Sequence, residues 1–513
     1  MFPKYTLLFT ILFPLSIYSQ KDSTAARYSL NVTAGGMSKN LHILASDEYE
    51  GRETGKKGQK MAAEYIAARF KESGIPPYKE NSYYQEFPVN VILPAPADIT
   101  VNGKKFKGNK DFYNFPGLTE QKTTSATVVF LGYGIEEEKY NDYRTDIKDK
   151  IVMVLGGEPY SKDSISLITG KKSPSLWSTY YKTKSEKIRE KGALALLIVV
   201  DDIEKEMAVN KHRLEKPAMV KNNQGRQMPV IYVSKEMADQ ILKKNSVEKI
   251  KNKISGSGAS LNLELKREVT INVINTAQKL MTENVLGFVE GSDLKNEVVV
   301  ITAHYDHLGK DENVVYNGAD DDGSGTVAVI ELAKVFAQAK KDGKGPRRSM
   351  LFMTVSGEEK GLLGSSYYVD HPEYPLENTV CDLNIDMIGR LDERHSGNPN
   401  YIYLIGSDKL SSELHAISEK ANSTYTNLEL DYTYNDEKDK NRFYYRSDHY
   451  NFAKNGIPVI FYFNGVHADY HKETDEVEKI DFAKMEKITR LVFFTAWEVA
   501  NRNERIKVDS NKK

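Results

Sequence analysis

Two histidines and six acidic residues lie close together in the stretch HYDHLGKDENVVYNGADDDGSG, which runs from His304 to Gly325. The stretch follows EVVVITA, an apolar run typical of a buried strand. Carboxylates that are brought together where a buried strand ends repel one another and lose hydration, which costs free energy. The stretch is therefore either a solvated loop or a place where cations bind.

Further histidines and carboxylates follow other strand-like runs in the same way. Glu358 and Glu359 come after LFMTVSG, Asp386 comes after DLNI, and His471 lies in VHADYH after VIFYFNG. Function gathers at the carboxyl ends of the strands of an open α/β sheet, so we expect these side chains at one edge. Two histidines and three carboxylates suffice to hold two divalent metal ions with one carboxylate bridging, and zinc accepts such ligands.

The adjacent glutamates Glu358 and Glu359 suit a division of labour. Neighbouring side chains on an extended segment point in opposite directions, so one can bind metal while the other faces the water that the metal activates. Zinc lowers the pKa of bound water to about 7, and a nearby carboxylate can take its proton and pass it to a leaving amine. The pair therefore predicts metal-assisted hydrolysis.

Each of these features alone also fits an ordinary structural role. The run ADDDG is typical of a turn that caps a helix, and GEEKG is typical of an acidic helix start. A single histidine is more often a hydrogen-bonded surface residue than a ligand, and we place His307, His449 and His467 outside the metal site. The convergence of five candidates on one edge of a sheet favours the metal interpretation over these alternatives.

Strand-like and helical runs alternate in the second half of the chain, which predicts an α/β fold. We expect a three-layer mixed sheet, parallel in its centre, with helices on both faces. The predicted segments are a catalytic domain formed by residues 25–96 and 268–504, an inserted β-rich domain over residues 97–267, one long helix at GTVAVIELAKVFAQAKK, and a disordered tail over residues 505–513.

The N-terminus has the pattern of a secretory signal peptide over residues 1–19, with a positive charge in MFPK, the apolar run YTLLFTILFPLSIY and a small residue before Gln20. We therefore expect export to the periplasm or the medium, and no membrane attachment after cleavage. The single cysteine, Cys381, excludes an intramolecular disulfide and is expected in a buried strand. A net charge of −1 gives no electrostatic reason to expect nucleic acid as a partner.

With these residues identified, the chain resembles the M28 family of zinc aminopeptidases, in the branch that carries an inserted protease-associated domain. The resemblance covers nearly the whole chain after the signal peptide. It rests on the number and order of its motifs: LASDEYEGRETGKKGQKMAAEYIAARF, NVLGFVEG, AHYDHLG, NGADDDGSG, SGEEKGLLGS, NIDMIG, SDHYNFAKNGIPVIFY and DYHKETDEVEKI.

The resemblance implies a role for each candidate residue of the metal site. His304 and Asp386 correspond to the ligands of one zinc ion, Glu359 and His471 to the ligands of the other, and Asp321 to the bridging carboxylate. Asp321 is the middle residue of three consecutive aspartates at positions 320–322. The family also implies a cis peptide bond between Asp321 and Asp322.

Further residues correspond to family positions around the metal ions. Glu358 matches the general acid and base, and Asp306 matches the carboxylate that orients the histidine ligand through its other ring nitrogen. Tyr470 matches a tyrosine that stabilises the oxyanion in some members, or else packs beside the site. Asp475 and the run SDH at 447–449 are expected to have structural roles.

The resemblance implies an exported exopeptidase with two zinc ions per chain, which removes N-terminal residues from peptides with a free N-terminus. A carboxypeptidase or dipeptidase of the same family is the nearest alternative. Glutaminyl cyclisation uses this scaffold with a single zinc ion, and receptor-like relatives have lost metal ligands. The preferred N-terminal residue, the role of the inserted domain and the oligomeric state stay open.

Overall fold

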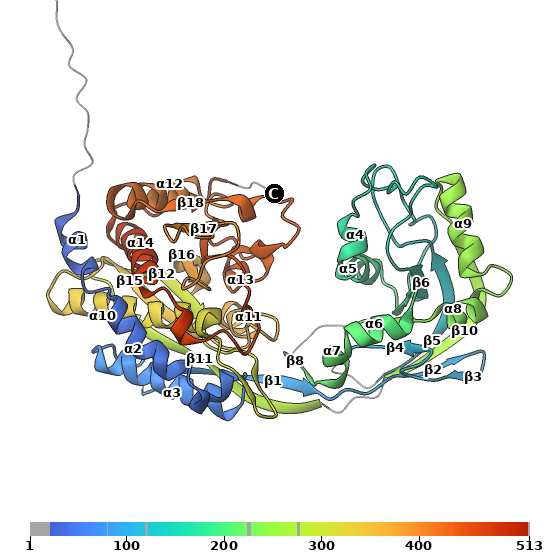
Figure 1. Ribbon diagram of the computed structural model, residues 1–513, viewed down its shortest axis with the longest axis horizontal. Coiled ribbons are helices and arrows are strands. Elements are labelled where there is room, and N and C mark those ends of the chain that lie inside the picture. The colour runs from blue at the N-terminus through green and yellow to red at the C-terminus, as the bar shows by residue number, and fades with distance from the viewer. Residues whose placement is uncertain (1–20, 80, 118–121, 223–226, 274–276, 511–513) are drawn as a thin grey trace, which may run out of the picture. The chain divides into compact units, whose positions relative to one another are not determined.

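The computed structural model describes residues 21–79, 81–117, 122–222, 227–273 and 277–510 (Figure 1). The predicted signal peptide over residues 1–19 lies outside the described residues. The chain divides into two compact units, Met1–Phe87 with Thr282–Lys513, and Pro88–Met281. The second unit is wider than the inserted segment 97–267 expected from the sequence.

The first unit is built on a mixed sheet whose centre is parallel. The strands follow the order β18 (Glu429–Asp431), β17 (Tyr401–Ile405), β19 (Val459–Phe463), β16 (Thr379–Ile385), β12 (Leu294–His304), β15 (Arg348–Val355), β11 (Ala277–Val289) and β1 (Tyr84–Ile92). Strands β19, β16, β12 and β15 run parallel, whereas β17 and β11 are antiparallel to their neighbours β19 and β15. The predicted fold class is therefore confirmed.

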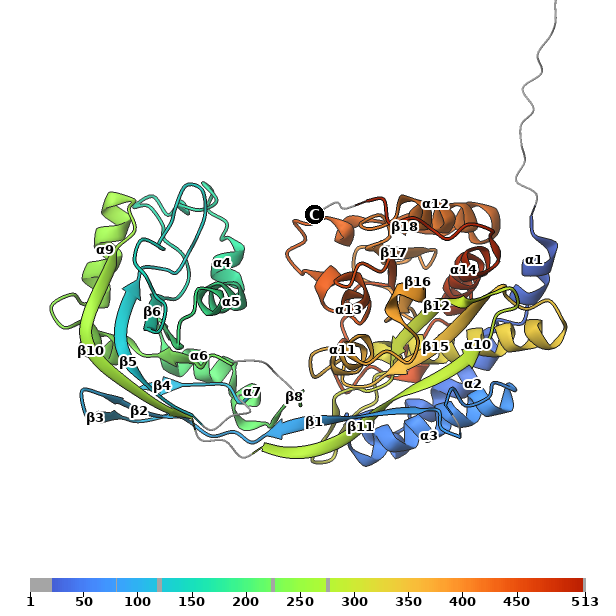
Figure 2. The ribbon, with the colours of Figure 1, turned by 180° about the vertical axis from the view of Figure 1, so that it is seen from behind.

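Helices cover both faces of this sheet, which gives the three layers (Figures 1 and 2). Alternate residues of β12 point to opposite faces, so Val299 and Ile301 pack in one core while Val298 and Val300 pack in another. The first core holds α2 (Ala34–Leu44), α3 (Lys57–Glu72), α10 (Gly325–Lys341) and α14 (Phe482–Asn501), and the second holds α11 (Leu363–Asp370) and α13 (His449–Ala453).

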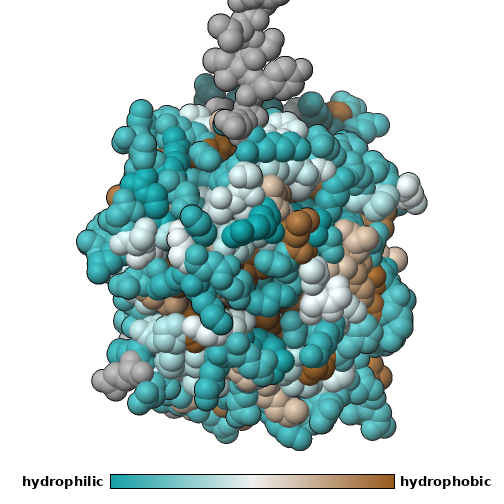
Figure 3. Space-filling view, turned by 90° about the vertical axis from the view of Figure 1, so that its left-hand side faces the viewer, coloured by the Kyte–Doolittle hydropathy of each residue, from teal (hydrophilic) through white to brown (hydrophobic). Residues whose placement is uncertain are grey.

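Smaller elements complete the first unit. They are α1 (Ser23–Ser29), α12 (Ser412–Ala421) and the hairpin of β13 (Gly309–Asp311) and β14 (Val314–Tyr316). Cys381 is buried in β16, as expected. Within the described residues, no helix combines the length and the apolar character needed to cross a bilayer. The face shown in Figure 3 is mainly hydrophilic, with its hydrophobic residues scattered.

The second unit has its own sheet and core. Its strands follow the order β3 (Lys104–Phe106), β2 (Asp98–Val101), β10 (Asn262–Val273), β5 (Lys122–Leu131), β6 (Ile151–Leu155), β7 (Ala195–Val199), β9 (Val230–Val233) and β4 (Phe112–Tyr113). Strands β5, β6, β7 and β9 are parallel. Its other elements are α4 (Leu176–Thr179), α5 (Lys182–Glu190), α6 (Ile203–Val209), α7 (Lys211–Glu215), α8 (Lys235–Leu242), α9 (Val247–Ser257) and β8 (Ala218–Lys221). β8 pairs with residues 89–92 of β1, which belong to the same unit.

The prediction of a disordered tail over residues 505–513 is wrong for residues 505–510. Ile506 is buried in the main core, at 4% exposure. The carboxylate of Asp509 accepts hydrogen bonds from the backbone and hydroxyl of Ser412, at 2.8 and 2.7 Å, and Arg505 donates to the carbonyl of Thr379 at 2.7 Å. One apolar anchor and these bonds order a segment whose composition is polar.

This anchor leads to a stability prediction. Replacing Ile506 with alanine is expected to lower the free energy of unfolding by about 2–5 kcal/mol, because the mutation leaves a cavity in the core. Val508, which is 55% exposed, provides the control. Urea unfolding of the Val508→Ala protein should match that of the wild type, and equal effects of the two mutations would show that the tail does not pack as described.

Candidate metal centre

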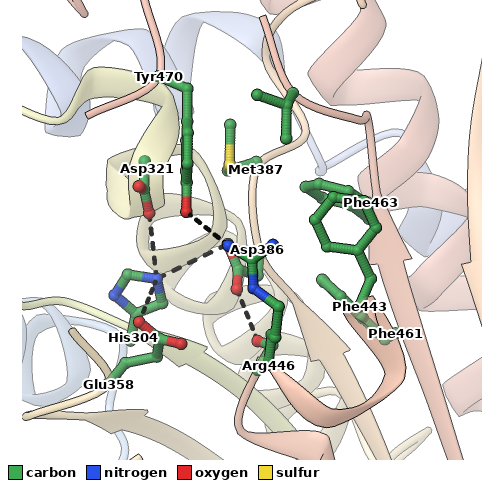
Figure 4. Close-up of a pocket in the computed structure, with 12 residues that line it drawn as sticks. His304, Asp321, Glu358, Asp386, Met387, Phe443, Arg446, Phe461, Phe463 and Tyr470 are labelled. Atoms are coloured by element: carbon green, nitrogen blue, oxygen red, sulfur yellow. Dashed lines mark hydrogen bonds and ion pairs between the residues drawn. The ribbon is translucent and has the colours of Figure 1, made fainter. Parts of the chain in front are cut away.

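All five predicted ligands lie at the carboxyl edge of the parallel strands, and Figure 4 shows three of them, His304, Asp321 and Asp386. His304 is the last residue of β12, Asp386 follows β16 directly, and Glu359 follows β15 after a short turn. His471 lies in the loop after β19, and Asp321 lies in the turn before α10. The parallel pairing of β15, β12, β16 and β19 therefore brings together residues that are far apart in the sequence.

The first group of possible ligands consists of His304, Asp321 and Asp386. His304 Nε2 lies 3.3 Å from Asp321 Oδ1 and 3.6 Å from Asp386 Oδ1. The other ring nitrogen of His304, Nδ1, lies 3.0 Å from the carbonyl oxygen of Asp306, which accepts a hydrogen bond when Nδ1 is protonated. That contact leaves Nε2 free to face the two carboxylates.

The second group shares Asp321 with the first. His471 Nε2 lies 3.0 Å from Asp321 Oδ2 and 3.3 Å from Glu359 Oε1. His307, which the sequence interpretation places outside the site, forms a set with the same two carboxylates, and the ligand atoms of this set all lie within 4.8 Å of one another; we include both His307 and His471 in the second group. Asp321 thus turns one oxygen toward each group, as a bridging carboxylate does.

Unpaired buried atoms show that the groups fit metal ions. Within the described residues, Asp321 Oδ2 and Glu359 Oε1 are buried without a hydrogen-bond partner. Such atoms are costly unless a cation meets them. Imidazole nitrogen and carboxylate oxygen are also the ligands that zinc accepts. The residues present are therefore suited to hold two divalent ions.

The pKa shifts in the second group also favour binding of a metal ion. Burial disfavours the charged form of His471, but the carboxylates of Asp321 and Glu359 outweigh burial and raise its pKa to about 10. Burial and Asp321 raise the pKa of Glu359, but His307 and His471 outweigh them and lower it to about 2. These carboxylates therefore attract positive charge strongly, which favours binding of a cation.

The hydrogen bonds of the three consecutive aspartates show which of them faces the two groups of possible ligands. Asp320 Oδ1 accepts from the N–H of Gly389 at 2.6 Å. Asp322 accepts from the N–H groups of His304, Gly325 and Met387 at 2.8–3.2 Å. Asp321 alone of the three is left to face both groups.

The backbone of this turn agrees with two further expectations. The peptide bond between Asp321 and Asp322 is cis. The carboxylate of Asp475 accepts hydrogen bonds from the N–H groups of Asp320 and Asp321, at 3.0 and 3.1 Å. Asp475 therefore fixes the turn that carries Asp321, as its expected structural role requires.

Asp306 differs from its expected role. Its carboxylate lies 3.8 Å from His304 Nδ1, and its main-chain carbonyl is the closer acceptor. The carboxylate instead accepts from the N–H of Glu358 at 3.1 Å and from the hydroxyl of Thr54 at 2.7 Å. Asp306 therefore positions the backbone of Glu358 and orients His304 through its carbonyl.

In the run SDH at 447–449, which the structure describes in full, only Ser447 contacts a predicted ligand. The hydroxyl of Ser447 donates to Asp386 Oδ2 at 2.6 Å, which directs Oδ1 toward His304. Asp448 accepts from the hydroxyl of Ser365. The ring of His449 is buried against Phe461, with centroids 4.7 Å apart. These contacts are structural, as expected from the sequence.

Glu358 and Tyr470 line the cavity beside the two groups (Figure 4). Glu358 Oε2 lies 4.0 Å from His304 Nε2, and burial is the main cause that raises the pKa of this carboxyl well above its ordinary value. The ring of Tyr470 stacks on His471, and its hydroxyl accepts from Arg446 at 3.3 Å. The remaining wall is mainly apolar, formed by Met387, Phe443, Phe461, Phe463 and Val466.

The sequence of this chain is similar to the sequences of known peptidases. Residues 284–496 match the model of Peptidase family M28. Aminopeptidase YwaD of Bacillus subtilis is 26% identical over 313 residues, which cover 57% of this chain and 54% of that protein. A probable leucine aminopeptidase of Arthroderma otae is 30% identical over 214 residues, covering 40% and 55%. The chain thus matches about half the length of these curated relatives.

A solved structure shares the fold over nearly the whole chain. The aminopeptidase from Aneurinibacillus sp. strain AM-1 has a TM-score of 0.52 with 18% sequence identity, covering 94% of this chain and 98% of that one. At this identity the similarity shows the fold alone. It extends over both units of the chain.

Proposed function

The chain carries a domain of peptidase family M28, and from this premise we propose that it is a zinc aminopeptidase that acts on peptides with a free N-terminus. The observation that supports the proposal most strongly is the pair of ligand groups that share Asp321, with buried oxygens that lack a partner within the described residues. The proposal includes two zinc ions per chain, held by His304, Asp321, Glu359, Asp386 and His471. It also includes export, which rests on the sequence of residues 1–19.

The proposed chemistry divides the work between metal and protein. Bound zinc supplies a Lewis acid that polarises the scissile carbonyl and activates water. Glu358, outside both ligand groups but at their edge, takes the proton of the attacking water and passes it to the leaving amine. Its backbone is fixed by Asp306, which keeps the carboxylate at the cavity.

Tyr470 is proposed to donate a hydrogen bond to the carbonyl oxygen as negative charge develops there. Arginine is only a donor, so the hydroxyl oxygen of Tyr470 accepts from Arg446 and its own hydrogen is left for another acceptor. The hydroxyl points into the cavity beside Asp386 (Figure 4). The stacking of its ring on His471 holds this orientation.

The alternatives fit these observations less well. A glutaminyl cyclase needs one zinc ion, whereas the ligand atoms form two groups. A receptor-like relative has lost ligands, whereas each position expected to bind zinc holds a suitable side chain. A carboxypeptidase or dipeptidase shares the metal site, and the names of the curated relatives favour the aminopeptidase.

A peptide digest tests the proposal. The zinc-loaded full chain is incubated with a mixed peptide library and with the same library acetylated at the N-terminus, and products are identified by mass spectrometry. We expect stepwise loss of N-terminal residues, no cleavage of acetylated peptides, and two zinc ions per chain by elemental analysis. Loss of C-terminal residues would contradict the aminopeptidase, and a single zinc ion would contradict the two-zinc site.

A further inference from the structure

His307 is a fully buried histidine in the loop after β12, with a side-chain exposure of 0%. The loop is held on several sides. The N–H of His307 donates to the carbonyl of Arg52 at 3.2 Å, and a Cβ at Gly318 would lie only 2.4 Å from the imidazole ring. The ring therefore has little freedom to turn away from its neighbours.

Neither ring nitrogen of His307 has a hydrogen-bond partner among the residues that the structure describes. Nδ1 lies 2.9 Å from Glu359 Oε1 and 3.9 Å from Asp321 Oδ2. The same two oxygens are also buried and, within those residues, without partners. His307 Nδ1 and Glu359 Oε1 are therefore close enough for a hydrogen bond, but their relative orientation does not form one.

Three buried polar atoms that lie close together without a hydrogen bond are costly in the absence of a further partner. Zinc binds nitrogen and carboxylate oxygen at about 2.0–2.2 Å in tetrahedral sites, so two of its ligand atoms lie about 3.3–3.6 Å apart. The distances of 2.9 and 3.9 Å lie on either side of that spacing, and the ligand atoms of His307, Asp321 and Glu359 all lie within 4.8 Å of one another. One ion can therefore satisfy all three atoms.

We propose that His307 is a ligand of the second zinc ion, in addition to Asp321, Glu359 and His471. This inference rests on the proposed two-zinc site. It assigns the two imidazoles of this group different environments, because the side chain of His307 is 0% exposed and that of His471 is 36% exposed. His307 is the buried anchor of the second ion, and His471 closes the site from the solvent side.

Zinc affinity of a His307→Ala protein tests the assignment without relying on catalysis. Loss of an outer hydrogen-bond partner lowers metal affinity by about 10–100-fold. Loss of a ligand should exceed that range, so competition with a chelator is expected to show one zinc site unchanged and the other weakened more than about 100-fold. A loss of 100-fold or less would overturn the proposal.

His449→Ala is the matched control. His449 is also fully buried, and its ring nitrogens likewise have no partner in the described part of the chain, but it belongs to neither ligand group. Its replacement should leave both zinc affinities unchanged. If His449→Ala and His307→Ala weaken zinc equally, the effect comes from the loss of a buried ring and the proposal fails.

A second measurement uses the unmodified protein, in case the variants fail to fold. In the cobalt-substituted wild type, paramagnetically shifted ring N–H signals count the histidine ligands. The proposal predicts three, from His304, His307 and His471, and a count of two overturns it.

A protein that binds two metal ions with three histidines but cleaves no peptide would refute the proposed function alone. A peptidase with two histidine ligands would refute this inference alone, and a chain that binds no zinc would refute both.

Discussion

Replacing Glu358 with glutamine is expected to lower kcat for release of an N-terminal residue by about 10²–10⁴-fold, the usual contribution of a general acid or base. The amide keeps the size of the side chain but cannot accept the proton of the attacking water. Glu358 belongs to neither ligand group, so both zinc ions should stay bound. Steady-state kinetics, combined with elemental analysis of the same sample, checks both parts of the prediction.

The adjacent Glu359 provides the contrast. Its Oε1 lies 3.3 Å from His471 Nε2 and belongs to the second ligand group. The same change to glutamine there removes the negative charge, and we expect loss of one zinc ion as well as of activity. The proposed division of labour is wrong if Glu358→Gln releases zinc, or if Glu359→Gln keeps both ions with full affinity.

The convergence of the ligands could be predicted because it follows from strand polarity. Residues that follow parallel strands lie at one edge of the sheet. The proximity of His304, Asp386 and Glu359 therefore follows once the apolar runs before them are assigned as strands. The long helix was equally clear, since GTVAVIELAKVFAQAKK coincides with α10. The hydrophobic periodicity of the sequence and the order of its strands were enough to predict the centre of the fold.

The details within the loops could not be predicted in this way. The resemblance singled out Asp321 among three aspartates, and the hydrogen bonds of Asp320 and Asp322 with distant backbone N–H groups give the physical reason. His307 was placed outside the site because a lone histidine usually has a structural role. Its position three residues after His304, in the same acidic loop, was the available indication.

The tail was misjudged for a related reason. Polar composition predicts disorder on average, but one buried side chain, Ile506, and the capping contacts of Asp509 suffice to order residues 505–510. The bounds of the second unit were also hard to place. The long strands β1 and β11 each continue across the division between the units, so no change in composition marks it.

Arg52 is the residue outside the ligand groups whose replacement should have the largest effect on stability and metal binding together. Its buried guanidinium donates to four carbonyls, those of Leu44, Tyr305, Asn317 and Gly318, at 2.6–2.9 Å. Tyr305 lies beside the proposed ligand His304, and Gly318 lies three residues before the proposed ligand Asp321. Arg52 therefore joins the two segments that carry ligands.

The charge of Arg52 also matters. Burial lowers its pKa to about 10, so the guanidinium is still positive at neutral pH, beside the carboxylates of Asp475 and Asp306. Removing one partner from a buried charged network costs about 3–5 kcal/mol. We expect Arg52→Met to lower the free energy of unfolding by about this amount, measured by urea denaturation of the metal-free protein.

The Arg52→Lys substitution distinguishes the effect of the positive charge from the effect of the hydrogen-bond geometry of the guanidinium. Arg52→Lys keeps a positive charge, but one ammonium group has three donors and lacks the fork that reaches four carbonyls, so the two ligand segments should loosen. Arg348, 1% exposed, is the control, because it also donates to main-chain carbonyls but those belong to residues 499–503. Arg348→Lys should destabilise the fold without weakening zinc, whereas Arg52→Lys should weaken zinc as well. Equal zinc affinities in the two variants would mean that Arg52 supports only the fold.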